Sequence, residues 1–114
     1  MAACFELSNS SDGQFMFVLK AVNGDVILSS ELYRARSLAE QDIVAVQNNC
    51  ALDECYERKV SANGKFMFNL KASNQQLLGT SQKYATTAAR DVGIASVKAD
   101  GVVTGIKYIV KYHA

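Results

Sequence analysis

Side chains that could act as nucleophiles, acids or bases are few in this chain, and most of them stand alone. The exception is a pair of polar residues that occurs twice, Ser30 with Tyr33 and Ser81 with Tyr84. Each pair follows a predicted strand, where its hydroxyls could hold a small molecule by hydrogen bonds. The same residues could instead anchor this connection, with the rings in the core and the serine hydroxyls bonded to the main chain. The sequence leaves both hypotheses open.

Acid and base chemistry has only weak candidates. Glu6 and Glu57 could in principle act as paired carboxylates, but both lie on predicted strands, and the charged neighbours of Glu57 favour a surface ion pair. The single histidine, His113, stands one residue from the C-terminus, which is a poor position for a catalytic base. We therefore expect that the protein is not an enzyme and has no catalytic residues and no cofactor.

Three cysteines, Cys4, Cys50 and Cys55, cannot all pair with one another. An odd number of cysteines in a chain without an export signal indicates reduced thiols, which we expect to behave as small apolar side chains. A reactive thiol at Cys50 or Cys55 is the alternative. The Cys-x2-Cys spacing and the histidine partners of a zinc site are missing, so we expect no metal site.

Length and composition indicate one cytoplasmic domain. A chain of 114 residues can bury a hydrophobic core, and 49% apolar with 20% charged residues is ordinary for a soluble protein. The net charge of +1 gives no global field that would attract nucleic acid or an anionic membrane. No apolar run approaches the roughly 18 residues of a membrane span, so we expect no membrane partner.

The organisation of the chain follows from an internal repeat. A heptapeptide at residues 15–21 returns at residues 66–72, with Asn69 in place of Val18. The same offset of 51 residues aligns both Ser-x-x-Tyr pairs without a gap. Two copies are too few for a solenoid, whereas two half-domains related by a pseudo-twofold axis can share one core. The predicted boundaries are 1–114 for the single domain and approximately 4–55 and 55–111 for the two repeats.

Each repeat is predicted to form three strands, a helix and a closing strand. Asp12-Gly13 and Asn63-Gly64 favour tight hairpin turns, and a change of apolar spacing from two to 3.6 residues marks each helix. The segment 54–60 must close the first repeat and also open the second, which would join the repeats into one sheet. The predicted strands of the first repeat are 5–9, 15–21 and 26–30, the predicted helices are about 35–49 and 86–99, and the closing strands are 54–60 and 105–111.

Three finer predictions concern turns and helices. Ser37 followed by Glu40 fits a capping box at the start of the first helix. The turn at Asn74 has lost the glycine of the first repeat, so we expect Asn74 to take the left-handed conformation. Val92 is expected on the buried face of the second helix, together with Ile94.

Alternation along the repeated strand separates two faces. The Phe, Phe, Leu and Ala positions are expected to pack against the helices, because burial of such side chains stabilises the fold. The opposite face mixes apolar and charged side chains, which suits a protein partner or a second copy; a solvated face with cross-strand Lys-Glu pairs is the alternative. The residues of this possible interaction face are Met16, Val18, Lys20, Met67, Asn69 and Lys71.

The two Phe-x-Phe-x-Leu-Lys-Ala strands, each followed by Asn, an apolar strand, Ser-x-x-Tyr and a helix ending near Ile-x-x-Val, resemble the YegP-like family of small bacterial proteins. The resemblance is to the duplicated subfamily and covers roughly residues 4 to 110. The stretch 86–94 is similar to the start of the family's second helix. Asp42 departs from the pattern, because the family commonly has there the glycine seen at Gly93.

This resemblance implies an α+β fold. Tandem β3-α-β repeats would form one largely antiparallel sheet, with two helices packed on one face, a pseudo-twofold and closing strands exchanged between the repeats. It also implies that the chain is a monomer whose repeats are arranged like a dimer. The family is functionally uncharacterised, so the resemblance implies no activity.

We therefore expect a non-enzymatic interaction module that uses its open sheet face or an edge strand to bind an as yet unknown protein partner. A small-molecule binder at the two Ser-x-x-Tyr connections is the alternative. Nucleic-acid binding has the weakest support: a sheet platform would need aromatic rings beside its lysines, and the repeated phenylalanines are expected on the opposite face. The lysines that would serve it are Lys20, Lys59, Lys71 and Lys107.

Overall fold

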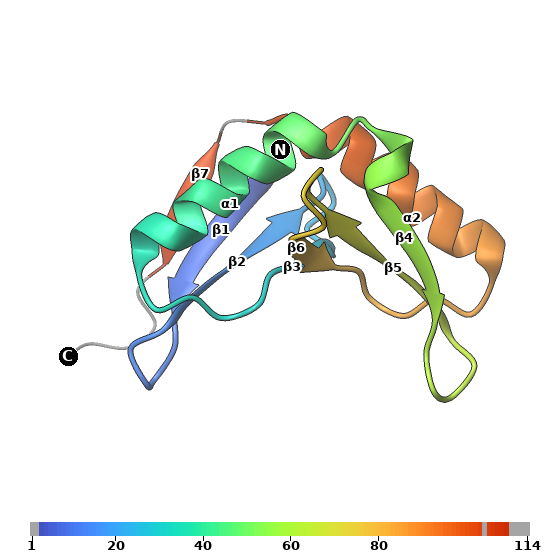
Figure 1. Cartoon of the computed structure of the whole chain (residues 1–114), viewed down its shortest axis with the longest axis horizontal. Helices are drawn as coiled ribbons and strands as arrows, with labels where there is room; N and C mark the ends of the chain where they lie inside the picture. The colour runs from blue at the N-terminus through green and yellow to red at the C-terminus, as the bar shows by residue number, and fades with distance from the viewer. Residues whose placement is uncertain (1–2, 104, 110–114) are drawn as a thin grey trace.

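The chain folds around one bent sheet with both helices on the same side, and the computed structural model describes residues 3 to 103 and 105 to 109 (Figure 1). The strand order in the described part is β4-β5-β6-β3-β2-β1-β7. The elements are β1 (Cys4–Asn9), β2 (Phe15–Lys20), β3 (Val26–Ser29), α1 (Arg36–Asn49), the 3-10 helix η1 (Asp53–Cys55), β4 (Tyr56–Val60), β5 (Phe66–Lys71), β6 (Leu77–Thr80), α2 (Thr87–Asp100) and β7 (Ile106–Ile109).

The predicted strands and helices are confirmed, with ends that differ by one or two residues. The start of the predicted strand 54–60 is the exception, because residues 53–55 form η1. The end of the predicted strand 105–111 and His113 lie outside the described residues. We call residues that are 51 positions apart twins, and we call β1 to α1 the first repeat and β4 to α2 the second repeat.

The turns between strands follow the turn residues of the sequence. Gly13 and Gly64 have φ angles of 82° and 81°, as the tight hairpins require. The prediction for Asn74 is wrong: its neighbour Gln75, the twin of Gly24, takes the left-handed conformation with φ 72°. The side chain of Asn74 instead accepts a hydrogen bond of 3.0 Å from the main-chain N–H two residues on, which holds the turn locally.

The two repeats are joined in three ways. β3 and β6 pair at Ser29 and Thr80, which makes one sheet of the two halves. α1 packs on β2 of its own repeat and on β6 of the other, and α2 packs in the same way on β5 and β3. β7 follows α2 but pairs in parallel with β1 of the first repeat. The tandem α+β fold with exchanged closing strands is therefore confirmed.

The core lies between the sheet and the helices. Phe17, Leu19, Phe68 and Leu70 are fully buried there, so the predicted apolar face of the repeated strand is confirmed. The apolar faces of the two helices lie on the other side of the core, opposite the sheet. α1 buries the apolar residues that were predicted for it. These residues are Ala39, Ile43, Val46 and Cys50.

Two helix predictions are wrong. Ser37 lies inside the first turn of α1, whose N-cap is Ala35 without a side-chain hydrogen bond, so no capping box forms. Val92 is 67% exposed. Two residues correspond to roughly 200° around a helix, which turns Val92 away from the sheet when Ile94 faces it. α2 begins as expected, because Thr86 accepts a hydrogen bond of 3.1 Å from the N–H of Ala89.

Candidate functional site

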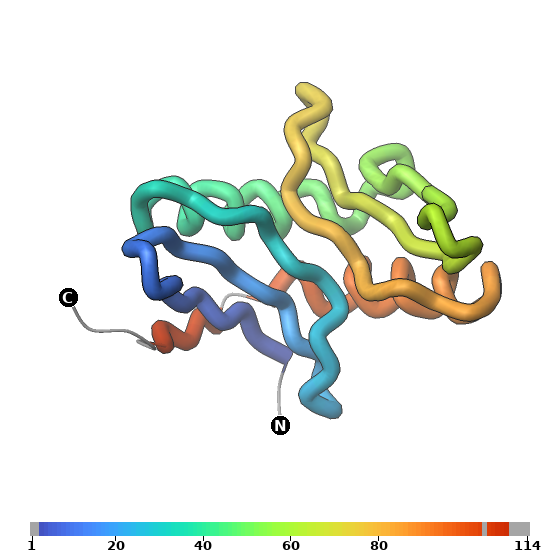
Figure 2. The backbone as a smooth tube through the Cα atoms, turned by 90° about the horizontal axis from the view of Figure 1, so that it is seen from below, coloured from blue at the N-terminus to red at the C-terminus, as the bar shows by residue number. Residues whose placement is uncertain are grey.

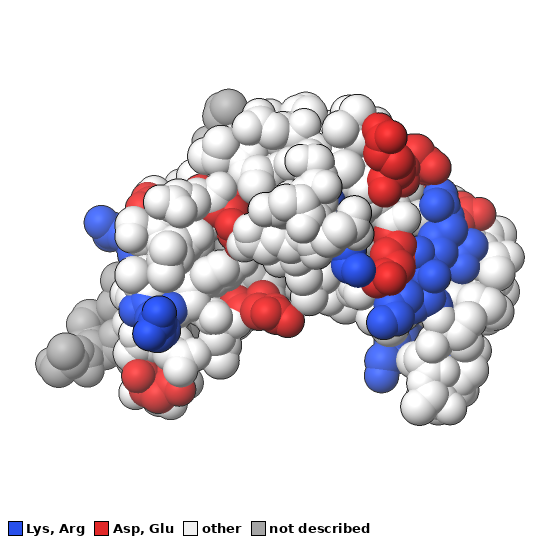
Figure 3. Space-filling model, in the orientation of Figure 1, with Lys and Arg blue, Asp and Glu red and all other residues white. Residues whose placement is uncertain are grey.

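The predicted interaction face lies on the side of the sheet that neither helix covers. Figure 2 shows the strands from this side, with the helices behind them, and Figure 3 shows the molecule as an arch that is hollowed beneath. All six predicted residues are on β2 and β5, and all are half-buried between neighbouring strands. These residues are Met16, Val18, Lys20, Met67, Asn69 and Lys71. We call this surface the open face.

In the second repeat the open face carries a continuous polar network across β4, β5 and β6. Glu57 forms an ion pair of 3.3 Å with Lys71 and accepts a hydrogen bond of 3.1 Å from Asn69. Asn69 in turn accepts a hydrogen bond of 2.8 Å from the Thr80 hydroxyl. The hydrogen bond from Asn69 and the contact with Lys71 lower the pKa of the Glu57 carboxyl. Glu57 is thus held as an anion and is a poor proton donor.

In the first repeat the same network is interrupted. Glu6 and Lys20 form an ion pair of 3.2 Å, as their twins do. Val18 replaces the linking asparagine, so the network ends there and Val18 pairs with Ser29 on the next strand. Met16 and its twin Met67 are alike, so Val18 in place of Asn69 is what makes this half of the open face more apolar. The two halves of the face therefore differ in chemistry, although their backbones are alike.

The two predicted serines are engaged with the main chain. Ser30 accepts a hydrogen bond of 2.8 Å from the N–H of Phe17 and donates one to the carbonyl of Glu31. Ser81 makes the equivalent bonds, at 2.9 Å from Phe68 and 2.7 Å to Gln82. In each repeat the serine thus ties the end of one strand to its neighbour.

The fold nevertheless brings both serines to one hollow on the open face, close to the pseudo-twofold axis. Its volume is about 470 Å³. The tyrosines of the two connections, Tyr33 and Tyr84, do not line it. The lining residues are Asp25, Val26, Ser29, Ser30, Glu31, Thr80, Ser81 and Gln82. Six of these eight residues carry a hydroxyl or a carboxylate.

Tyr33 has a different environment from its twin. Its hydroxyl donates a hydrogen bond of 2.6 Å to Asp42, which also accepts one of 3.2 Å from Gln76 of the second repeat. Burial, followed by the hydrogen bond to Asp42, raises the pKa of the Tyr33 phenol. Near Tyr84 the twin of Asp42 is Gly93, and the Tyr84 hydroxyl fills the space where a Cβ would stand. The sequence marked Asp42 as a departure from the family pattern but did not indicate this buried contact.

The thiols of Cys50 and Cys55 are not activated. Cys50 and Cys55 are buried, and burial raises the pKa of both thiols. All three cysteines are free. A thiol with a raised pKa is protonated at neutral pH and reacts slowly. The geometry therefore favours the interpretation of these residues as apolar packing groups.

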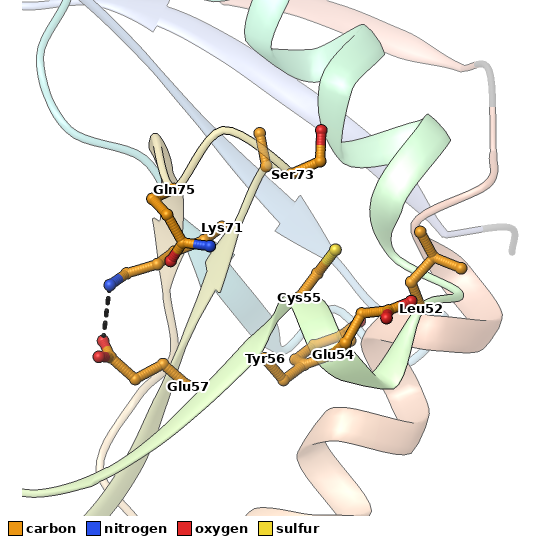
Figure 4. A pocket seen from close by; sticks show the side chains of 9 residues that line it. Leu52, Glu54, Cys55, Tyr56, Glu57, Lys71, Ser73 and Gln75 are labelled. Carbon is orange, nitrogen blue, oxygen red and sulfur yellow. Dashed lines mark ion pairs between the residues drawn. The ribbon is translucent and has the colours of Figure 1, made fainter.

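A second hollow of about 660 Å³ adjoins Cys55 at the start of β4 (Figure 4). The Glu57–Lys71 ion pair stands on one side of it, and Tyr56 lies at the other. The Tyr56 hydroxyl is engaged, because it donates a hydrogen bond of 2.6 Å to the carbonyl of Cys50. Two carboxylates also line the hollow: Glu57 is held by Lys71 and Asn69, and burial together with the charge of Glu54 raises the pKa of the Cys55 thiol. The sequence did not predict this hollow.

The four lysines predicted for nucleic-acid binding are spread across the sheet: Lys20 lies on β2, Lys71 on β5, and Lys59 and Lys107 on the two outermost strands, β4 and β7. Lys20 and Lys71 are paired with carboxylates, and the phenylalanines of β2 and β5 pack on the helix side. Within residues 3–103 and 105–109, no group of three or more His, Cys, Asp or Glu could hold a metal ion. No helix in this part of the chain is long and apolar enough to cross a membrane.

The outer side of β4 is the one strand edge in the second repeat without a neighbour among the described residues. Next to it, Arg58 forms ion pairs with Asp53 at 3.1 Å and with Asp91 at 3.9 Å. Lys98 joins the same cluster through Asp53 at 2.9 Å. Charged side chains therefore flank this edge on the helix side.

Comparison with known proteins gives consistent matches along the chain. The family model "Domain of unknown function (DUF1508)" matches twice, at residues 10–57 and 61–107. The UPF0339 protein YegP of Escherichia coli K12 is 56% identical over 107 residues, which cover 94% of this chain and 97% of that protein. A UPF0339 protein of Shewanella oneidensis is 53% identical over the same shares.

Two solution NMR structures have the same fold. YegP from E. coli, described as a protein of unknown function, superposes with a TM-score of 0.93 at 53% identity and covers 99% of this chain and 97% of that chain. A UPF0339 protein from S. oneidensis gives a TM-score of 0.91 at 51% identity, with 99% and 96% covered. The predicted resemblance is confirmed by both.

Proposed function

Because this chain belongs to the family "Domain of unknown function (DUF1508)", whose description assigns no activity, we propose that it is a non-enzymatic module that binds a protein partner through its open face. One observation carries the proposal. The open face is uncovered, and its side chains are fixed in two different patterns, apolar around Val18 and polar around Asn69. Side chains that are already ordered lose little conformational entropy on binding.

A partner that fits this surface has one apolar part and one polar part. Met16 and Val18 suit an apolar segment, whereas the network around Glu57 and Asn69 suits groups that exchange hydrogen bonds. A symmetric partner centred on the pseudo-twofold axis would match only one half. The engaged serine hydroxyls and the raised pKa of the cysteine thiols support the non-enzymatic part of the proposal.

The proposal is tested by affinity capture from a bacterial lysate with the immobilised protein. The Met16→Asp, Met67→Asp double variant changes the open face, and the Val44→Asp, Val92→Asp double variant adds the same charge on exposed helix surface. We expect the face variant to lose proteins that both the wild type and the helix variant retain. Identical sets of captured proteins for all three would overturn the proposal.

The hollow between Ser30 and Ser81 favours one second candidate, a binder of small polar molecules at the strand-to-helix connections. Thermal shifts with a metabolite library, followed by NMR shifts at Ser30, Tyr33, Ser81 and Tyr84, test it. Ser29→Val and Thr80→Val remove hydroxyls from the hollow and leave the serine anchors intact. A ligand that acts there must lose its effect in this double variant, and a library without any response removes the candidate.

We further propose that the protein works as a cytoplasmic monomer with reduced thiols. The exchange of closing strands within one chain supports this, because the second repeat already supplies the strand that covers β1. Light scattering coupled to size-exclusion chromatography tests the monomer, with a mass of 12.4 kDa expected. A mass near twice that value would contradict it.

A further inference from the structure

The second repeat lacks a strand that the first repeat has. β7 covers the outer side of β1 in parallel. The twin of β1 is β4, and its outer side has no strand among the described residues. The reason lies in the chain order: the segment that follows α1 forms β4 itself, so no separate closing strand remains for β4. The position of β7 shows how such a strand would lie.

The contact between β1 and β7 defines a register. Phe5 pairs with Ile106, and its N–H donates a hydrogen bond of 3.0 Å to the carbonyl of Gly105. In a parallel ladder, every second residue of β1 bonds to two residues of its neighbour. Leu7, which pairs with Tyr108, is the next residue in that series. Their twins on β4 are Tyr56 and Arg58.

The main chain of Arg58 points outward, away from the sheet. Arg58 pairs with Phe68 of β5, and the main-chain groups of Phe68 are bonded on their other side to Ser81. In an antiparallel ladder such a pair exchanges no hydrogen bonds, so both residues direct their N–H and C=O away from each other. The carbonyl of Tyr56 is directed to the same side, whereas its N–H already donates to Asp53.

We propose that the outer edge of β4 binds an extended segment of a partner protein, which adds in parallel as an eighth strand in the place that corresponds to β7. This inference rests on the proposed function as an interaction module and names a place and a partner for it. The segment would bond to the carbonyl of Tyr56 and to both main-chain groups of Arg58. Strand addition to an exposed edge is an established mode of peptide recognition.

The side chains along β4 specify the chemistry of that segment. Lys59 is exposed and forms no ion pair with a described residue, so the segment residue in register with it is acidic. Glu57 is in register with a basic residue, as Glu6 is with Lys107. The segment residue in register with Tyr56 is apolar. The one in register with Arg58 is aromatic and uncharged, because Asp53 and Asp91 already balance the charge of Arg58. From the residue beside Tyr56 to the residue beside Lys59, the segment is therefore apolar, basic, aromatic and acidic in turn.

A second copy of this chain is a poor occupant of the edge. Antiparallel pairing of two β4 strands about Arg58 would bring Glu57 opposite Lys59 of the other copy, but it would also place the two arginine side chains, each with its own pair of aspartates, directly opposite each other. Charged residues on an edge strand discourage unselective pairing. They also restrict the edge to segments of complementary charge, which is the selectivity a binding site needs.

The test uses the full-length protein and a capped peptide, Gly-Ile-Lys-Tyr-Glu-Gly, which takes the β7 sequence and carries glutamate in register with Lys59. A control peptide has lysine in place of the glutamate. We expect the first peptide to shift the NMR signals of Arg58, Lys59 and Val60 and, at saturation, to slow amide exchange at Arg58 by about tenfold or more. The control should bind about fivefold more weakly.

Variants separate the contribution of the main-chain groups of β4 to binding from that of its side chains. Arg58→Pro removes the outward N–H at a position where an edge strand tolerates proline, and Arg58→Ala keeps the N–H. We expect binding to be lost in the first and retained in the second. Lys59→Glu should reverse the preference between the two peptides, and it decides the question even if the proline variant does not fold.

The outcome also distinguishes this inference from the proposed function. Absence of any response at Arg58, or shifts confined to Met16 and Val18, would overturn strand addition at β4. Unchanged peptide preference in Lys59→Glu would do the same. If Arg58→Pro captures the same lysate proteins as the wild type while the Met16→Asp, Met67→Asp variant does not, the open face remains the binding surface and the edge does not.

Discussion

Leu28 occupies the space in which a side chain of its twin, Gly79, would stand: its Cγ lies 2.7 Å from the position of a Cβ at Gly79. A second twin pair behaves in the same way, because the Sγ of Cys50 lies 2.8 Å from the position of a Cβ at Gly101. In these two pairs the twins meet near the pseudo-twofold axis, and only one residue of each pair carries a side chain there. The repeats are therefore complementary at their junction.

A substitution at this junction tests the complementarity. Gly79→Ala places a Cβ against Leu28, and overpacking of this kind lowers the free energy of unfolding by about 1–3 kcal/mol. Leu28→Ala leaves a cavity and costs about 2–5 kcal/mol. The combination Leu28→Ala with Gly79→Leu returns the volume from the other side, so urea unfolding should show a smaller loss than the single variants Leu28→Ala and Gly79→Leu predict together. A loss of unfolding free energy equal to or larger than the sum for the single variants would contradict the inference that positions 28 and 79 share one space.

The buried contact between Tyr33 and Asp42 provides a matched pair of variants. Tyr33→Phe removes a donor from a buried carboxylate, which lowers the free energy of unfolding by about 1–3 kcal/mol. Tyr84→Phe removes the same atom where no hydrogen bond to a described residue is present, so we expect a change within about 0.5 kcal/mol. Chemical denaturation measures both. Equal losses in the two variants would show that the contact with Asp42 does not stabilise the fold.

Alkaline pH should destabilise the protein through Tyr56. Burial, with Cys50 and Cys55 nearby, raises the pKa of its phenol above the ordinary value of about 10. The unfolded chain therefore loses this proton first. The resulting stability is complete below about pH 10 and falls above it by about 1.4 kcal/mol per pH unit. Thermal unfolding should show a flatter decline between about pH 10 and pH 11 in Tyr56→Phe than in the wild type.

Amide exchange distinguishes the two outer strands. The outward N–H of Leu7 is covered by β7, whereas that of its twin, Arg58, faces no strand among the described residues. We expect Arg58 to exchange about a hundredfold faster than Leu7. The twins Phe17 and Phe68, whose N–H groups both donate to a serine hydroxyl, serve as controls and should be protected alike. Similar protection of Leu7 and Arg58 would mean that the edge of β4 is covered.

The sequence predicts the fold well because its signals are local and occur twice. Alternation in the heptapeptide separates the Phe17 face from the Met16 face, and the glycine turns fix the hairpins. Local signals fail where a structural feature depends on the rotational position of a residue around its helix or on contacts between distant parts of the chain. Val92 is apolar but lies on the wrong side of α2 relative to Ile94. Apolar character alone does not show which side of a helix meets the sheet.

The candidate sites depend on contacts that no local pattern contains. Gln76 reaches Asp42 across the boundary between the repeats, 34 residues away in the chain. The hollow between Ser30 and Ser81 exists only because β3 and β6 pair at the pseudo-twofold axis. Sequence reasoning found that one segment serves both repeats, which is the reason that β4 has an open edge. It did not indicate which strand would lack a neighbour.

The placement of β7 beside β1 also determines how the chain responds to tension. The two strands run in parallel, so residue 3 precedes one end of the pair and residue 109 stands at the other. A force that pulls these two positions apart therefore slides one strand along the other and loads all their hydrogen bonds at once. Among the described elements, the first and last strands thus resist stretching of the chain through their mutual hydrogen bonds, while β4, at the opposite edge of the sheet, bears none of that load.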